Sequence, residues 1–113
     1  MAIQPGTYNF TLQRRSDHTI PLLFKDGNDA AINLTNYTVE AQVWEETRIT
    51  KYADFTTTYT ARSAGSVSIS LTDTQTATFT PDILKYDVLL TDPSGSKEFY
   101  LEGTIYVSEG YTT

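Results

Sequence analysis

The part of this chain that most constrains its fold is residues 66–107, where apolar and polar side chains alternate over three separate segments. Residues 66–71, 85–91 and 99–107 each have an apolar residue at every second position. A period of two is typical of β-strands that have one face on a core and the other in water. The stretch therefore predicts three amphipathic strands, and it contains no pattern typical of a reaction centre.

Turn signals separate the predicted strands. Thr72 and Gln75 have the spacing of a capping box, in which both side chains satisfy free amides at a helix start, so a short helical turn is expected near residues 72–78. Asp-Pro-Ser-Gly at residues 92–95 predicts a tight turn, because proline presets φ and glycine accepts the left-handed region. The Asp-Gly pair within residues 25–28 is typical of a hairpin turn.

Further strands are predicted in the first half of the chain. Residues 8–12, 20–24 and 37–43 alternate in the same way, and Pro21 is tolerated best if the second of these strands lies at a sheet edge. Residues 50–62 are rich in threonine and tyrosine, which favours strand over helix. Their alternation is poor, so we expect an edge strand or a hairpin there.

Seven to eight short strands with turns every 8–12 residues predict an all-β fold, an immunoglobulin-like antiparallel β-sandwich. A length of 113 residues indicates one domain, residues 1–113. The chain has no cysteine, so it lacks the disulfide of antibody domains and can offer no thiolate nucleophile or sulfur ligand.

The alternation also predicts which side chains are buried. Ten strand residues should form the core: Val39, Val43, Val67, Ile69, Leu71, Val88, Leu90, Leu101, Ile105 and Val107. The same pattern puts Phe99 on the inward face of the last strand, and Trp44, Tyr100 and Tyr106 on outward faces.

The charge balance argues against nucleic acid as a partner. The net charge is −6, and the only adjacent basic pair, Arg14 and Arg15, is followed closely by Asp17. Duplex binding needs clustered cations, because phosphate neutralisation supplies most of its affinity. No apolar stretch approaches the ~20 residues of a membrane span, and the start lacks the features of a signal peptide. We therefore expect no membrane partner and synthesis in a cytoplasm.

No catalytic or metal constellation is evident. His18 is the only histidine, and as a general base it would need an orienting partner. Its acidic neighbour, Asp17, would point to the opposite face of a strand, so we expect His18 to be a solvated loop residue. The oxygen-rich turn at residues 26–29 lacks the spacing of a calcium loop, and Glu45 and Glu46 are a weak acid–base pair. We expect no enzyme activity and no cofactor.

Three Asn-x-Thr triplets begin at Asn9, Asn33 and Asn36. They match the glycan acceptor pattern, but such triplets are expected by chance in a chain whose β-strands are rich in threonine.

The aromatic residues are the most useful candidates for a binding surface. Exposed tryptophan and tyrosine are enriched at protein interfaces, and the same side chains can stack on sugar rings. The alternative is that a loop or the second sheet covers them. Together with the aromatics of the predicted edge segment, the candidate partner contacts are Trp44, Tyr52, Phe55, Tyr59, Tyr100 and Tyr106.

Three segments resemble a family of small β-sandwich domains in tailed-phage virion proteins. NLTNYTVEAQV at residues 33–43 resembles the family stretch DLTGYTV.A.I, and GSVSISLTDTQTA at residues 65–77 resembles G.VTLSLT..QTA. KYDVLLTDPSG at residues 85–95, together with LEGTIYV at residues 101–107, resembles YDLELTDPDG…LLEGTVTV. The order and spacing fit over residues 7–108, and the family includes the N-terminal domain of baseplate upper proteins.

The resemblance implies a non-catalytic structural protein of the virion, made in the host cytoplasm and assembled with other virion proteins and copies of itself. Residues 16–19, Ser-Asp-His-Thr, depart from the Gly-Asp-Thr usual in the family, and the chain ends soon after the domain. These departures favour a free-standing tail or baseplate adaptor, or a fibre-attachment subunit, over a receptor-binding role. The alternatives are a capsid decoration protein and a carbohydrate-binding or adhesin module.

Overall fold

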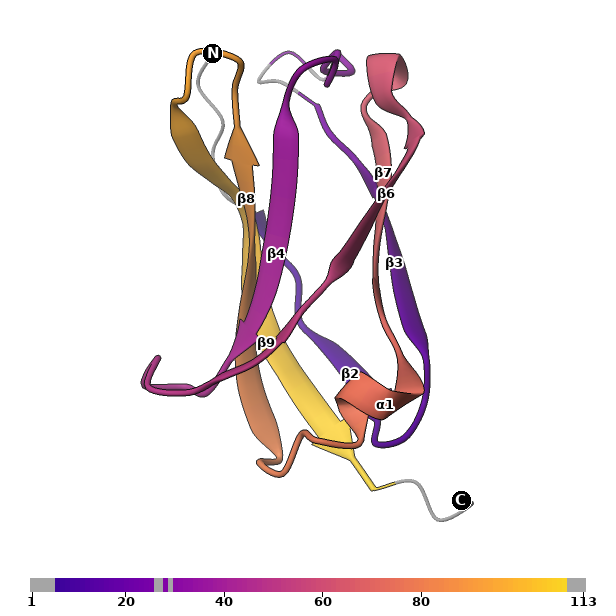
Figure 1. Ribbon diagram of the computed structural model, residues 1–113, viewed down its shortest axis with the longest axis vertical. Coiled ribbons are helices and arrows are strands. Elements are labelled where there is room, and N and C mark those ends of the chain that lie inside the picture. The colour runs from indigo at the N-terminus through magenta and orange to yellow at the C-terminus, as the bar shows by residue number, and fades with distance from the viewer. Residues whose placement is uncertain (1–5, 26–27, 29, 110–113) are drawn as a thin grey trace.

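The computed structural model describes residues 6–25, 28 and 30–109, which form two β-sheets packed face to face (Figure 1). The elements in chain order are β1 (Gly6–Thr7), β2 (Phe10–Gln13), β3 (His18–Leu23), β4 (Thr38–Trp44), β5 (Lys51–Asp54), β6 (Thr56–Ala61), the 3-10 turn η1 (Arg62–Ala64), β7 (Ser66–Leu71), α1 (Asp73–Thr76), β8 (Ile83–Thr91) and β9 (Lys97–Ser108). Since β1 and β2 follow one another along β9, they act as one interrupted strand, and the described part of the chain has eight strand positions. The predicted all-β sandwich is confirmed.

The larger sheet has the order β1/β2–β9–β8–β4–β5, and the smaller one has the order β3–β7–β6. Strands β4, β8 and β9 facing β3, β7 and β6 reproduce the immunoglobulin arrangement. The sheets are antiparallel except at the first strand, because β1 and β2 run parallel to β9. Residues 14–17 carry the chain from one sheet to the other, so β2 pairs with β9 and makes no hairpin with β3.

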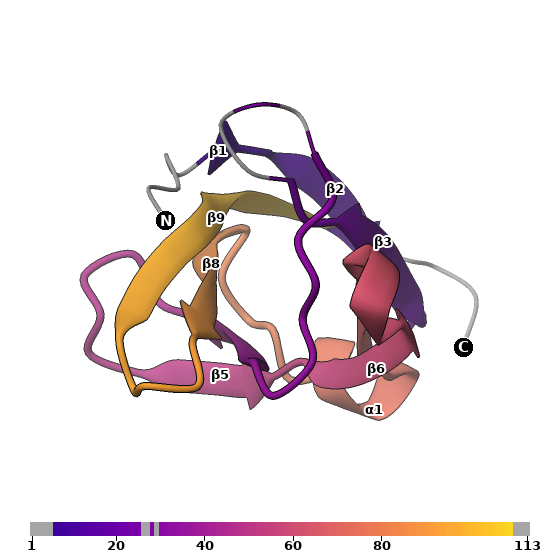
Figure 2. The ribbon, with the colours of Figure 1, turned by 90° about the horizontal axis from the view of Figure 1, so that it is seen from above.

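Residues 50–62 contain two edge strands that belong to different sheets. β5 pairs with β4 at the edge of the larger sheet, and β6 pairs with β7 at the edge of the smaller sheet. Figure 2 shows the two strands following one another along one side of the sandwich. The buried Phe55 lies at the crossing, where its amide donates to the Ala41 carbonyl oxygen at 2.9 Å. The edge location is therefore confirmed, whereas a single strand or a hairpin is wrong.

The core lies between the sheets and agrees closely with the predicted alternation. Nine of the ten predicted core residues are buried, and the tenth, Leu101, is partly buried and packs against them. Pro21 lies in β3, an edge strand, as its missing amide hydrogen requires. The largest fully buried side chains include Phe24, Phe79, Leu12, Leu34 and Leu84.

A β-bulge in β9 changes which side chains face outward. Leu89 of β8 lies opposite Phe99, while the preceding residue of β8 lies opposite Leu101, so Tyr100 is an extra residue in β9. The alternation reverses at this point. Phe99 is half exposed, and the Tyr100 ring stacks on the buried Phe24 with centroids 4.2 Å apart. The predicted inward Phe99 and outward Tyr100 are therefore both wrong.

Two local signals are confirmed in detail. Thr72 Oγ1 accepts from the Gln75 amide at 3.2 Å, and Gln75 Oε1 accepts from the Thr72 amide at 2.9 Å, which completes the capping box of α1. In the turn after β8, Asp92 Oδ1 accepts from two backbone amides at 2.9 Å, and Gly95 has φ of +94°. The predicted hairpin turn at 25–28 lies partly outside the described residues.

Candidate functional site

A groove of about 650 Å³ lies on the outer face of the larger sheet, which is turned away from the smaller sheet. Three cross-strand rows from β4, β8 and β9 form its floor: Trp44–Lys85–Thr104, Gln42–Asp87–Glu102 and Glu40–Leu89–Phe99. Glu45, Glu46 and Arg48 of the turn after β4 also line the groove, as do Thr7 and Asn9 near the first strand. The regular pairing of the sheet thus holds these side chains side by side.

Apolar groups occupy two separate parts of this groove. The Trp44 indole donates to Gln42 Oε1 at 2.9 Å, and the Arg48 guanidinium lies 5.1 Å from the centre of the indole ring. Two rows away, the half-exposed Phe99 lies opposite the partly buried Leu89. The row of Gln42 and Asp87 separates the two apolar parts, so the groove is amphipathic along its length.

Two carboxylates lie directly opposite each other in the middle row. Asp87 of β8 pairs with Glu102 of β9, an arrangement that is unfavourable for like charges on neighbouring strands. Partial burial raises the pKa of Asp87, the Glu102 charge raises it further, and Arg48 opposes the shift. The sheet therefore holds a carboxylate here that a neighbouring positive charge would stabilise.

The groove carries more negative than positive groups. Five carboxylates line it, against the two cations Arg48 and Lys85: Glu40, Glu45, Glu46, Asp87 and Glu102. Lys85 Nζ donates to Thr104 Oγ1 at 2.8 Å. Within residues 6–25, 28 and 30–109, no three histidine, aspartate or glutamate side chains are close enough together to hold a metal ion. The groups present are suited to non-covalent recognition of a partner that carries positive charge.

The six aromatic side chains predicted to contact a partner do not form one surface. Trp44 lines the groove, and Tyr106 lies on the same outer face, where it is 46% exposed and opposite Ile83. Phe55 is 6% exposed and packs in the core, because it fills the crossing between the two sheets. Its prediction as a surface contact is therefore wrong in this fold.

The remaining three tyrosines stabilise the fold through their hydroxyl groups or rings. Tyr59 Oη accepts from the Val39 amide at 3.0 Å, and the Arg62 guanidinium lies 3.9 Å from its ring centre. Tyr100 Oη donates to the Leu23 carbonyl oxygen at 3.1 Å. Tyr52 packs edge-on against a core ring, Phe79, with centroids 6.1 Å apart, and its hydroxyl lies 3.4 Å from Thr80 Oγ1. These contacts give all three rings a structural role.

Sequence reasoning missed most of the groove. Asp87 and Leu89 alternate with the buried residues of β8, so the sequence pattern alone could have indicated that both face outward. Phe99 had no such signal, because its outward position depends on the bulge at Tyr100.

His18 is not the solvated loop residue expected. It begins β3, is partly buried, and stacks on Phe10 with centroids 4.8 Å apart. Burial lowers the pKa of its imidazole, which favours the neutral ring. The candidate oxygen ligands of the turn at 26–29 lie mostly outside the described residues, and Glu45 binds the neighbouring Thr47 amide at 2.6 Å.

The three Asn-x-Thr triplets have local structural roles. Asn9 Oδ1 accepts from the Thr104 amide at 2.8 Å, and Asn33 Oδ1 accepts from the Thr35 amide at 3.0 Å. Asn36 has φ of +67°, which asparagine tolerates better than most residues. Turn and strand chemistry therefore accounts for each asparagine without a glycan.

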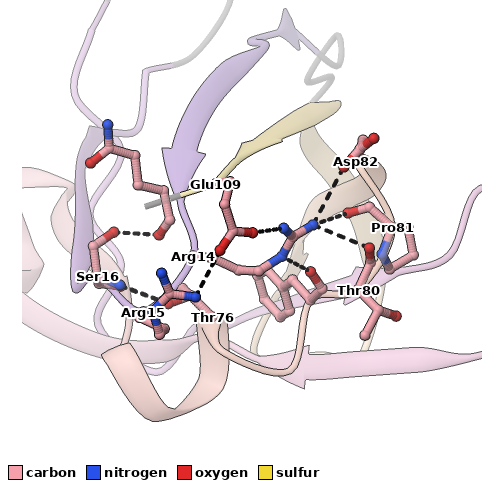
Figure 3. A network of polar contacts seen from close by, with 10 residues as sticks. Arg14, Arg15, Ser16, Thr76, Thr80, Pro81, Asp82 and Glu109 are labelled. Carbon is pink, nitrogen blue, oxygen red and sulfur yellow. Dashed lines mark hydrogen bonds and ion pairs between the residues drawn. The ribbon is translucent and has the colours of Figure 1, made fainter. Parts of the chain in front are cut away.

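A second polar cluster lies at the end of the sandwich near α1 (Figure 3). The Arg14 guanidinium donates to the carbonyl oxygens of Phe79 and Thr80 at 2.5 and 3.1 Å, and it pairs with Glu109. Arg15 also pairs with Glu109, at 2.9 Å, and the two guanidinium groups hold the pKa of this carboxyl below its usual range. The cluster fastens the end of β9 to the segment after α1, and we assign it a structural role.

No protein-family model matches the chain, and no curated protein matches its sequence. No helix among the described residues is long and apolar enough to cross a membrane.

Proposed function

We propose that this chain is a structural subunit of a tailed-phage particle and acts by protein–protein assembly without catalysis. The resemblance over residues 7–108 supports the phage origin, and the tail or baseplate is the location it favours, as an adaptor or fibre-attachment subunit. The observation that carries the assembly role is the groove on the outer face of the larger sheet. The partners are other virion proteins and copies of this chain, and the protein is made in the host cytoplasm.

The exposure of apolar side chains supports a binding role for the groove. Phe99 is 50% exposed at a position where the bulge turns it out of the core, and Trp44 lines the same groove. Neither side chain is needed there for the packing between the sheets. Aromatic side chains have few rotatable bonds, and they are typical of the central part of protein interfaces.

Mass spectrometry of purified particles tests the proposal. Particles from the phage that encodes this chain should contain its peptides in a fixed ratio to the known coat subunits, before and after a wash at high salt. A matched preparation from a phage with a stop codon early in the gene is the control. Absence of the polypeptide from intact particles would show that the proposed function is wrong.

A carbohydrate-binding role is the second candidate. The groove combines an indole ring with the Gln42 amide and the Asp87 carboxylate, groups that can stack on a sugar and accept its hydroxyl hydrogens. The Arg48 guanidinium over the Trp44 ring opposes this role, since a sugar must displace it or use the other ring face. Specific binding on a glycan array that is lost in Trp44→Ala and retained in Tyr106→Ala would favour this candidate over assembly.

A capsid decoration protein is a variant of the assembly role at another location. It differs from a tail subunit in copy number, so the ratio of this chain to the major capsid protein separates the two.

A further inference from the structure

We infer that the groove binds a basic segment of another protein, with an arginine between Asp87 and Glu102 and an apolar side chain against Leu89 and Phe99. The binding chemistry follows from the groove itself, and only the partner's identity as a virion protein rests on the proposed function.

The middle row of the groove holds two carboxylates side by side. Asp87 and Glu102 lie opposite each other on neighbouring strands, and no lysine or arginine among the described residues forms an ion pair with either carboxylate. A guanidinium presents several donors in one plane and can bridge two carboxylates, which a single ammonium does less well. An arginine placed here would relieve the repulsion that the sheet register imposes.

The spacing between the charged row and the apolar row matches the repeat of an extended peptide. Asp87 and Leu89 are two residues apart on β8, and both point outward. Same-face residues of an extended strand are about 7 Å apart, and an extended ligand has the same repeat. A segment with the pattern apolar–x–arginine, running along β8, therefore reaches both rows at once.

The groove of a second copy of this chain is a poor occupant because of its charge. Two copies joined through this groove would oppose five carboxylates with five more, against two cations on each side. Elsewhere in the described ranges, several cations already have partners, namely Arg14 and Arg15 with Glu109, Lys51 with Asp54, and Arg62 over the Tyr59 ring. Groove-to-groove contact between two copies is therefore unfavourable, and a basic segment of a different protein is the occupant that complements this charge.

A peptide titration followed by nuclear magnetic resonance tests the inference. The probe is acetyl-Leu-Ser-Arg-Ser-Leu-amide, added to the ¹⁵N-labelled full chain, and the matched probe has citrulline in place of arginine. Citrulline keeps the shape of arginine and removes the charge. We expect shifts centred on β4, β8 and β9, and about tenfold weaker binding of the citrulline peptide.

The variants locate the charge. Asp87→Asn with Glu102→Gln should weaken binding of the arginine peptide about tenfold. Asp54→Asn with Asp82→Asn removes the same charge from residues outside the groove and should leave affinity unchanged. Should the first double variant fail to fold, the comparison of the two peptides on the unaltered chain still decides the question.

Three results would overturn the inference: equal affinity for both peptides, shifts centred outside the groove, or no shifts. If particles contain the chain but the peptide test fails, the groove ligand is wrong and the proposed function stands. If the peptide test succeeds and particles lack the chain, the proposed function alone is wrong.

Discussion

Replacing Gly103 with alanine should be among the most damaging small substitutions in this chain. Gly103 lies in β9 opposite Tyr86, where the segment between β1 and β2 passes closely over the strand. A Cβ at this position would lie 1.9 Å from the Tyr8 carbonyl oxygen and 2.7 Å from its carbon. Both are backbone atoms, so no side-chain rotation can relieve the overlap.

The expected cost follows from the contacts that must move. The Tyr8 amide donates to the Glu102 carbonyl oxygen at 3.0 Å, and the Tyr86 hydroxyl donates to the Tyr8 carbonyl oxygen at 2.5 Å. Losing two such hydrogen bonds costs roughly 2 kcal/mol, and overpacking adds about 1–3 kcal/mol. The stiffer unfolded chain offsets about 0.5–1 kcal/mol, so Gly103→Ala should lower the free energy of unfolding by roughly 2–4.5 kcal/mol.

Gly6→Ala is the matched control. A Cβ at Gly6 would lie 3.6 Å from Leu101 Cδ1, an ordinary contact, so its effect should stay within about 0.5 kcal/mol. Urea unfolding followed by the fluorescence of Trp44, the only tryptophan, and by circular dichroism measures both variants. Equal stability of the two variants would mean that the first strand does not pass over β9 as the structure has it.

Three further predictions concern the core and two of the carboxyl groups with shifted pKa values, Asp87 and Glu109. Leu71→Ala should cost about 2–4 kcal/mol and Ser68→Ala little in urea unfolding; the reverse ranking would mean that the register of β7 is wrong by one residue. Asp87 has a raised pKa when folded, so its ionisation destabilises the fold as the pH rises above its ordinary value of 3.8. Asp87→Asn should therefore be more stable than the unaltered chain at pH 7, and an unchanged thermal midpoint would contradict this. Glu109 has a lowered pKa when folded, so its contribution is present above its ordinary value of 4.5 and is lost as the pH falls through the folded pKa. Thermal melts of Glu109→Gln should lose less stability on acidification than those of the unaltered chain, and parallel curves would show that the Arg14 cluster contributes nothing.

The features predicted correctly from the sequence are those set by local chemistry. The alternation of β7 and β8 fixes which residues are buried, and the capping box at Thr72 and the turn at Asp92 need only a few neighbouring residues. Each of these signals lies within a short stretch of chain, so no knowledge of the tertiary structure is required.

The features that sequence reasoning missed depend on contacts between distant segments. At Phe55 the chain passes from one sheet to the other. The Phe55 amide donates to the Ala41 carbonyl oxygen and its ring packs in the core, and nothing in residues 50–62 indicates either contact. At the bulge in β9, the ring and hydroxyl of Tyr100 have partners in the distant Leu23–Phe24 segment. The candidate site was therefore only half predictable: Trp44 from its outward phase, and Phe99 only from the structure.

A reconstruction of the assembled particle by electron microscopy tests the central claim most directly. The account predicts density for this sandwich on the particle, with the outer face of β4, β8 and β9 against another protein chain. A well-resolved particle that lacks the sandwich, or one that holds it with this face open to solvent, would contradict the account.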